Sequence, residues 1–392
     1  MRRTALMVCG EPSGDRLLAS IARALDPGLF SSVFGVCGEA MEAAQIEAVA
    51  DARALGAMGL MEGVRSLPTI AATAARVVAA IERRRPEVAI LASWSAPNAR
   101  LGAWLRTRGV RVMWIAPPEI WAWGRMRGAR LSRAADRFVV TLPFEVELWR
   151  GLGADARYFG HPTSALARPS REEARARLGL ADDVLAVGVL PGSRASEIDR
   201  LAPPMLDAAR ALARRNARVR PLAIVAPSMN ARARATLLRL AQRADVECVE
   251  APAATGALEV LPALDAAMVA SGTASLECAI AEVPAVVCYA LHPLTHALAK
   301  RLVDTPVIAL PNVLRVRAGL APIFPERVQR DVNAARLIAD VEALLQRAPH
   351  VREECASLRR SLGYGSFATG VAAWIAEEGW RRAPSAPLSS PR

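Results

Sequence analysis

Lysine is almost missing from this chain of 392 residues: Lys300 is the one lysine among 50 basic residues, and the rest are arginines. The GxxxxGK[ST] phosphate loop of many nucleotide-binding proteins requires a lysine and is therefore excluded. The formal net charge is +12, which predicts attraction to an anionic partner such as nucleic acid, an acidic membrane surface or a phosphorylated substrate. Biased base composition of the genome would account for many of these arginines equally well.

Long apolar runs are missing as well. Arg, Glu, Gly or Pro interrupts each run well before the roughly 18 residues that a membrane-spanning helix needs. The start, MRRTALMVCGEPSGD, has too short an apolar run for a signal peptide and leads directly into a strand and a helix. We therefore expect a cytoplasmic protein without a membrane-spanning segment.

Closely spaced cysteine and histidine motifs are absent. The histidines form no HExxH pattern, and the cysteines are scattered without the pairs of a zinc site or a disulfide framework. These residues are Cys9, Cys37, Cys248, Cys278, Cys288 and Cys355, with His161, His292, His296 and His350. We expect a reducing compartment, no metal and no other cofactor.

Short strand-like runs alternate with helical stretches along the chain, which is 53% hydrophobic and 22% charged. The runs are ALMV, SSVFGVCG, EVAILA, VRVMWIA, RFVVTL, VLAVGVL, LAIVAP, VECVE, AAMVAS and AVVCYA. Alternation of this kind predicts an α/β protein with two doubly wound parallel sheets. Pro162, Pro169 and the small residues of YFGHPTSALARPS interrupt the alternation and place the joint between domains 1–168 and 169–365. A helix over 366–383 and a disordered Pro/Ser-rich tail over 384–392 follow.

The stretch CGEPSGDRLL lies where the first predicted strand passes into the first predicted helix. One interpretation is an ordinary turn, in which glycines allow tight backbone angles and Ser13 or Asp15 caps the helix. The other is a ligand site, because unpaired N–H groups at a helix start attract anions. The residues of this stretch leave both interpretations open.

Two further strand-to-helix junctions, VGVLPGSRASEI and MVASGTASLECAI, carry small polar residues in the second predicted domain. The first places Ser193 and Arg194 directly after a strand, and the second does the same with Gly272 and Thr273, with Glu277 one turn later. Both are typical of diphosphate cradles built from backbone N–H groups and an arginine. Two ordinary capped helices would show the same pattern.

The chain resembles the bacterial lipid-A-disaccharide synthase family in motifs that occur in family order from residue 5 to about 345. These motifs are GEPSGD, AMGLMEGVRSLP, PPEIWAW, LPFEVELW, FGHP, LPGSRASEI, SGTASLE, HPLTHALAKRLV and ALPNVL. Proteins of that family join UDP-2,3-diacylglucosamine to 2,3-diacylglucosamine 1-phosphate by a β-1,6 bond and release UDP, without a metal. The resemblance implies a GT-B glycosyltransferase, with two Rossmann-like domains facing a central cleft.

The resemblance also implies roles for single residues. It places UDP-sugar in the C-terminal domain and the acylated sugar-phosphate acceptor, near GEPSGD, in the N-terminal domain. Arg194 would stabilise the diphosphate as the sugar leaves, and Glu277 would accept ribose hydroxyl protons in hydrogen bonds. The implied substrate-binding residues are Ser13, Gly14, Asn98, Ser193, Arg194, Gly272, Thr273, Ala274, Glu277 and Asn312.

The chain departs from the family at an acid. Ser93 occupies the place of the expected catalytic Asp, and a serine hydroxyl without a partner is a poor general base. Ala96 and Ala165 also replace family acids, whereas Glu119 stands where a neutral polar residue is usual. Glu119, Glu11 and Asp15 are the candidates for a replacement base. Glu119 could instead be an exposed acid favoured by the dipole at a helix start.

The segment LGAMGLMEGVRSLP combines apolar residues with Arg53 and Arg65 close by, which suits acyl chains and anionic headgroups. The candidate membrane contacts are Met58, Leu60, Met61, Val64 and Leu67, and core packing is the alternative. Trp121 and Trp123 could be interfacial or buried. We expect peripheral association with the inner membrane.

Three functions remain open. The first is the hexosyltransferase of lipid A synthesis, the second a UDP-sugar epimerase with the same two-domain fold, and the third a non-catalytic paralogue that binds a nucleotide sugar or lipid. The family has precedent for a homodimer. No helix-turn-helix or zinc-finger pattern supports nucleic-acid binding, so we expect none.

Overall fold

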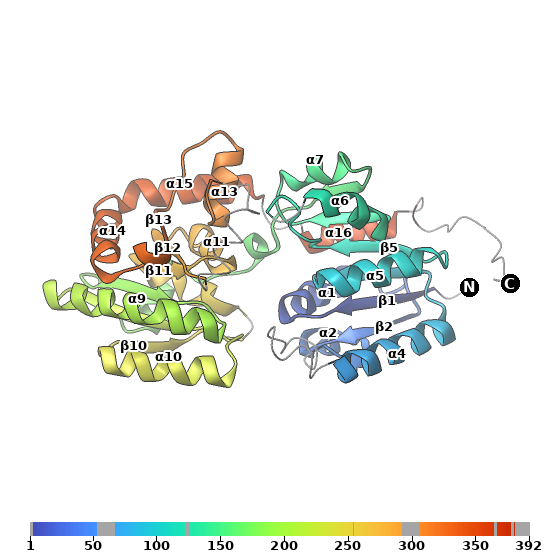
Figure 1. The fold of residues 1–392 in the computed structure, drawn as a ribbon, viewed down its shortest axis with the longest axis horizontal. Coiled ribbons are helices and arrows are strands. Elements are labelled where there is room, and N and C mark those ends of the chain that lie inside the picture. The colour runs from blue at the N-terminus through green and yellow to red at the C-terminus, as the bar shows by residue number, and fades with distance from the viewer. Residues whose placement is uncertain are drawn as a thin grey trace. The chain divides into compact units, whose positions relative to one another are not determined.

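The computed structural model describes residues 3–52, 67–122, 125–253, 255–291, 306–363, 367–377 and 380. The chain forms two compact units (Figure 1). The first comprises residues up to Ala165 together with those from Tyr364 onward, and the second runs from Leu166 to Gly363. The C-terminal part of the chain therefore belongs to the same unit as the N-terminus.

The first unit is built on a parallel sheet in the order β3-β2-β1-β4-β5-β6-β7. Its strands are β1 Thr4–Cys9, β2 Ser32–Cys37, β3 Glu47–Asp51, β4 Val88–Ala92, β5 Arg111–Ile115, β6 Arg137–Val140 and β7 Asp155–Tyr158. The helices are α1 Pro12–Ala24, α2 Glu39–Ala43, α4 Leu67–Arg84, α5 Ser95–Arg106, α6 Arg125–Leu131, α7 Glu145–Arg150 and α16 Phe367–Ala376. Strand order reverses between β1 and β4, so a crevice is expected at their carboxyl ends.

The second unit repeats this plan with the strand order β10-β9-β8-β11-β12-β13. Its strands are β8 Leu185–Leu190, β9 Val219–Val225, β10 Glu247–Glu250, β11 Ala266–Ala270, β12 Ala285–Tyr289 and β13 Glu326–Val328. Its helices are α8 Arg171–Arg177, α9 Ala195–Arg215, α10 Ala231–Ala244, α11 Thr273–Ile280, α13 Leu310–Arg317, α14 Ala334–Gln346 and α15 Ala348–Ser361. Here the order reverses between β8 and β11.

The central strands are apolar almost throughout because helices cover both faces of each sheet. Every residue of β4 and β11 is buried, and so is every residue of β1 after Thr4. The α/β class with two doubly wound sheets, which the alternating pattern predicted, is confirmed.

Helix α16 is held on the first unit by arginines of the sheet. Arg137 donates to Glu377 at 2.8 Å and Arg157 donates to the same carboxylate at 2.9 Å. The Arg157 guanidinium also lies 4.6 Å from the ring centre of Trp374, a buried residue of α16. A cation beside an aromatic face and a shared carboxylate together stabilise this attachment.

No helix in the described part of the chain is long and apolar enough to cross a membrane.

Candidate functional site

Four family motifs of the first unit, and the segment SWSAPN that contains Ser93, follow strands of its sheet. GEPSGD follows β1, SWSAPN follows β4, PPEIWAW follows β5, LPFEVELW follows β6 and FGHP follows β7. Because the carboxyl ends of parallel strands meet at one edge of a sheet, these five loops share that edge. The Ser93 N–H, for example, donates to the carbonyl of Ile115 at the end of β5, at 3.2 Å.

The loops after β1 and β4 are in close contact. A Cβ atom on Gly10 would lie 2.2 Å from Cγ of Trp94, so only glycine leaves room for the indole. A Cβ atom on Gly14 would lie 3.4 Å from Oγ of Ser93, which brings the GEPSGD loop beside the position of the missing acid. Ser93 and Trp94 have φ values of 50° and 48°, a left-handed conformation that costs energy for residues other than glycine.

Asn98 holds this unusual turn in place. Its side chain is fully buried, and Nδ2 donates to the carbonyls of Ala92 at 3.1 Å and Ser93 at 2.7 Å. Its Oδ1 is buried and has no hydrogen-bond partner among the described residues. Asn98 thus orients the loop that carries Ser93, and its contact with substrate stays a prediction.

Asp15 has a clear structural task. Its buried carboxylate accepts the N–H groups of Gly38 at 2.8 Å, Ala40 at 2.9 Å and Met41 at 3.1 Å. It therefore caps α2, whereas the turn interpretation expected a cap on α1. The N-cap residue of α1 is Glu11, whose side chain makes no capping bond. Glu11 and Ser13 are exposed.

Glu119, in the loop after β5, keeps part of its side chain in contact with solvent, but the protein around its carboxyl excludes enough water to raise its pKa above the usual value. Two residues later, Trp121 is buried and its indole N–H donates to Oε1 of Glu145 at 3.1 Å. This confirms the interpretation of Trp121 as a buried residue and not an interfacial one. Trp123 lies outside the described residues.

Glu145 is the site residue that the sequence interpretation missed. It begins α7, and its other oxygen accepts the N–H of Leu142 at 3.0 Å. Burial and, to a smaller extent, the negative charge of Glu119 raise its pKa to about 8. In the sequence, Glu145 is marked only as an acid within the mostly apolar stretch LPFEVELW. A surface acid at a helix start shows the same pattern, so the sequence could not indicate that Glu145 is buried.

His161, in the loop after β7, is buried and uncharged at neutral pH because desolvation lowers its pKa to about 4. Its Nδ1 accepts the N–H of Thr163 at 3.2 Å. The proton of the neutral ring is therefore assigned to Nε2.

In the second unit, the loop after β8 already holds a carboxylate. Oε2 of Glu197 accepts the N–H groups of Ser193 at 3.0 Å and Arg194 at 3.2 Å. Its Oε1 is 2.9 Å from the guanidinium of Arg194, whose side chain is 79% exposed. Gly192 has φ +103°, and a Cβ atom there would lie 2.3 Å from Oε2 of Glu197. The N–H groups and the guanidinium that could bind a phosphate therefore contact Glu197 instead. The sequence analysis had not singled out this acid.

The loop after β11 runs beside the loop after β8, because β8 and β11 are paired strands. Gly272 has φ +149° and precedes the first turn of α11, where no side chain caps the backbone. Gly272 and Thr273 are exposed, and a Cβ atom on Gly272 would meet nothing within 4 Å. Ala274 and Glu277 are half-buried. The two predicted phosphate loops are therefore brought together at the reversal of strand order, where ligands of such sheets bind.

Asn312 lies at the start of α13 and is fully buried. Its Oδ1 accepts the N–H groups of Ile323 and Phe324, and its Nδ2 donates to the Phe324 carbonyl and to Glu326. These four bonds use its whole capacity. Asn312 therefore fixes the chain between α13 and β13, and its place near a nucleotide stays a prediction.

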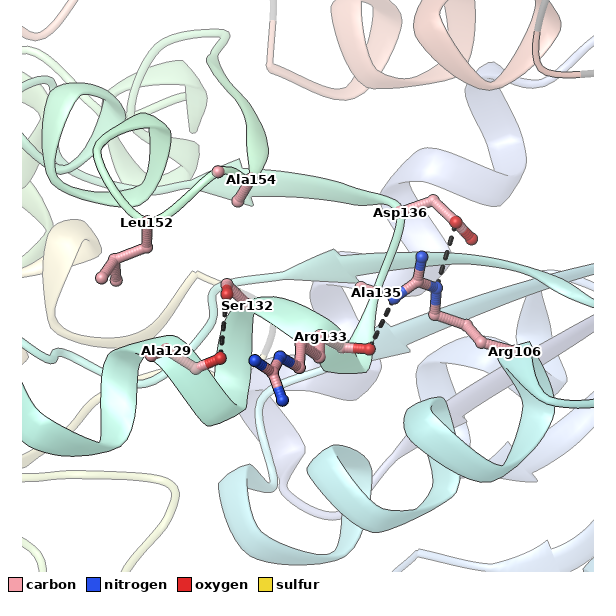
Figure 2. A pocket seen from close by; sticks show the side chains of 9 residues that line it. Arg106, Ala129, Ser132, Arg133, Ala135, Asp136, Leu152 and Ala154 are labelled. Atoms are coloured by element: carbon pink, nitrogen blue, oxygen red, sulfur yellow. Dashed lines mark hydrogen bonds and ion pairs between the residues drawn. The ribbon is translucent and has the colours of Figure 1, made fainter.

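A pocket of about 370 Å³ lies elsewhere on the first unit (Figure 2). Its lining comes from the end of α5, from residues 129–136, and from the turn before β7, which places it at the amino ends of β6 and β7. Arg106 lies at one side of it and donates to Asp136 at 3.1 Å and to the carbonyl of Arg133 at 2.6 Å. It contains none of the predicted site residues.

Among the described residues, no group of three or more His, Cys, Asp or Glu side chains is arranged to hold a metal ion. The candidate membrane contacts Met58, Leu60, Met61 and Val64 lie outside the described residues. Leu67 begins α4, but its side chain is not described.

Solved structures with this fold include UDP-GlcNAc 2-epimerase from Neisseria meningitidis bound to UDP-GlcNAc. That chain has a TM-score of 0.65 and 10% identity, with 96% of this chain and 99% of that one covered. A glycotransferase of kitacinnamycin has a TM-score of 0.61 and 18% identity, with 95% and 98% covered. The protein is therefore of the GT-B class, to which glycosyltransferases and such epimerases belong.

Within that class the chain belongs to the lipid-A-disaccharide synthetase family, whose model matches residues 5–361. Lipid-A-disaccharide synthase of Anaeromyxobacter dehalogenans strain 2CP-C is 36% identical over 359 residues, 90% of this chain and 91% of that protein. The Serratia proteamaculans protein of the same name is 34% identical over 351 residues, 88% and 90% of the two chains. The resemblance found in the motifs is confirmed, and the chain is a member of a glycosyltransferase family of lipid A biosynthesis.

Proposed function

We propose that this protein condenses UDP-2,3-diacylglucosamine with 2,3-diacylglucosamine 1-phosphate, forming lipid A disaccharide 1-phosphate and UDP. The observation that carries the proposal is the pairing of the Ser193–Arg194 loop with the Gly272–Thr273 loop on adjacent strands. Backbone N–H groups and an exposed arginine at such a place are the chemistry that a sugar diphosphate requires. Membership of the family supplies the proposed sugar substrates.

In this proposal the second unit holds the UDP-sugar. The diphosphate takes the N–H groups of Ser193 and Arg194 that Glu197 occupies, and the Arg194 guanidinium moves from Glu197 to a phosphate oxygen. As the bond between the sugar C1 and the diphosphate oxygen breaks, the electron pair leaves on UDP. Arg194 and the start of α11 stabilise the growing negative charge.

The first unit receives the acceptor in this proposal. Its 6-hydroxyl oxygen attacks C1 of the donor sugar while the hydroxyl proton passes to a general base. Glu119 is the proposed base because the family acid is replaced by Ser93, and because desolvation raises the Glu119 pKa toward the working range of a base. Glu11 remains a secondary candidate. We do not assign the role to Asp15, whose carboxylate caps α2.

We also propose peripheral association with an anionic membrane through residues 58–67, since both substrates of the proposed reaction carry acyl chains. The apolar residues of that segment would contact acyl chains, and Arg53 and Arg65 would contact headgroups.

The replacement of the family acid by Ser93 favours one other function, a non-catalytic paralogue that binds a nucleotide sugar or lipid. Mass spectrometry of the purified protein incubated with both lipid substrates separates the candidates. The proposed enzyme forms the disaccharide and UDP. A changed monosaccharide would indicate an epimerase, and the absence of any product would indicate the paralogue.

A further inference from the structure

The proposed reaction assigns no role to the buried acid Glu145. Its side chain lies at the carboxyl edge of the first sheet and is 1% exposed. Each of its oxygens accepts one hydrogen bond, from the Trp121 indole at 3.1 Å and from the Leu142 backbone at 3.0 Å. A buried carboxyl that forms hydrogen bonds with two separate loops fixes those loops relative to each other.

One of those loops carries Glu119. Trp121 is two residues further along, and it packs edge-to-face on Phe144, with ring centres 5.5 Å apart and planes at 79°. Phe144 directly precedes Glu145, so the segment around Glu119 contacts the start of α7 through both an aromatic pair and a hydrogen bond. The two carboxyls are also close enough for the charge of one to act on the other.

We propose that Glu145 is the positioning residue for Glu119: it holds the loop after β5 through Trp121 and itself stays protonated. Glu119 is then the member that ionises and is free to accept the hydroxyl proton of the acceptor. This inference rests on the proposed function, in which Glu119 is the general base.

The electrostatics of the pair support this division. Burial and, to a smaller extent, the Glu119 charge raise the pKa of Glu145 to about 8, although the N–H groups of Leu142 and Trp121 act against the rise. Tyr158 of β7 also faces the acid, and burial and the charge of Glu145 raise the pKa of its phenol. At neutral pH the proton therefore resides on Glu145, although the titration belongs to the pair.

Ionisation of Glu145 would place a second negative charge in a desolvated site beside Glu119. Because the two carboxylates would then repel each other and the loop that carries Glu119 would lose its fixed position, we expect turnover to fall as the pH rises through about 8, the pKa of Glu145. Glu145→Gln has the neutral charge of the protonated acid, but its amide nitrogen cannot accept the N–H group that the second carboxyl oxygen accepts. It should therefore lower turnover at pH 7, because the loop after β5 is held less firmly, and it should lose the alkaline fall.

The pH dependence of kcat/KM for the lipid pair tests this, with Glu147→Gln as the matched control. Glu147 is an exposed acid of the same helix, and its variant should keep the wild-type profile. Trp121→Phe removes the N–H that favours ionised Glu145, so it should move the alkaline fall to higher pH. An alkaline fall that is the same in wild type, Glu145→Gln and Trp121→Phe would overturn the proposal.

Thermal unfolding at pH 5.5 and 9 tests the retained proton without any turnover. The folded pKa of about 8 lies above the ordinary 4.5, so the stability contributed by neutral Glu145 is present at low pH and is lost as the pH rises through 8. The decrease in Tm between the two pH values should be smaller in Glu145→Gln than in wild type, by about 2 °C or more. An equal decrease in both proteins would overturn the proposal. If wild type forms no disaccharide but this Tm difference is present, the proposed function and the positioning role fail, and only the buried proton is supported.

Discussion

The carboxylate of Glu197 accepts the backbone N–H of Arg194 at 3.2 Å and lies 2.9 Å from the guanidinium of the same residue. Both groups are donors that an anionic phosphate would use. The loop after β8 therefore holds its own negative group at the position where we propose that the UDP diphosphate binds. Two predictions concern this pair.

Arg194→Ala should weaken UDP binding by roughly 1.5 to 3 kcal/mol, the range of a hydrogen bond to a charged group. Isothermal titration calorimetry with UDP, with no metal added, measures the effect. Arg200, roughly two turns further along α9, donates among the described residues to the backbone of Ser196, so Arg200→Ala is a matched control that should bind UDP as wild type does. Equal affinity for UDP in folded Arg194→Ala and wild type would remove Arg194 from the proposed donor site.

Glu197→Gln should bind UDP more tightly than wild type, by about 1 kcal/mol, because the diphosphate then displaces a neutral acceptor instead of a carboxylate. Titration with inorganic diphosphate and with uridine separates the two parts of the ligand. The gain should appear with diphosphate and be absent with uridine. Weaker binding of diphosphate would show that Glu197 organises the loop and does not compete with the ligand.

Glu119→Gln should lower turnover of the lipid pair by about 100-fold to 10,000-fold, the usual cost of removing a general base, with little change in UDP affinity. Ser93→Asp should restore activity in that variant, because Oγ of Ser93 is beside the GEPSGD loop and aspartate tolerates the left-handed backbone of this position. Product formation followed by mass spectrometry measures both effects. A wild-type protein that is inactive until Ser93→Asp is introduced alone would favour the non-catalytic paralogue.

Asp15→Asn should destabilise the fold by about 1 to 3 kcal/mol, because an amide cannot accept three N–H groups with both of its terminal atoms. Denaturant unfolding measures the loss. Glu11→Gln is the control, since Glu11 is exposed and makes no capping bond. If Asp15→Asn unfolds at the wild-type denaturant concentration and yet loses turnover, Asp15 acts in catalysis and not as a cap.

Leu60→Asp combined with Met61→Asp should reduce cosedimentation with vesicles that contain anionic lipid, while UDP binding stays intact. These residues lie outside the described part of the chain, so the prediction depends on the sequence pattern and on the acylated substrates of the proposed reaction. A variant that fails to fold would show that the segment belongs to the core.

The arrangement of the two sheets was predictable from sequence because their central strands are continuous apolar runs between turn signals, a pattern that burial on both faces imposes. Strands β3, β7 and β13 were missed. Each lies at a sheet edge and carries charged or polar residues, as in Glu47–Asp51, so neither burial nor alternation marks it in the sequence.

The loops that carry the candidate site were also predictable, since small and polar residues follow the strands at Gly10, Ser93, Ser193 and Gly272. What Asp15, Glu145 and Glu197 do was decided only by the tertiary structure. The partners of Asp15 and the indole that binds Glu145 lie at least 23 residues away along the chain. Glu197 accepts hydrogen bonds from its own loop. Whether an acid in the first turn of a helix folds back onto N–H groups or faces solvent depends on backbone angles such as φ +103° at Gly192. Sequence pattern specifies which residues are buried, whereas the partners of a buried or folded-back acid depend on how distant loops meet at the edge of the sheet.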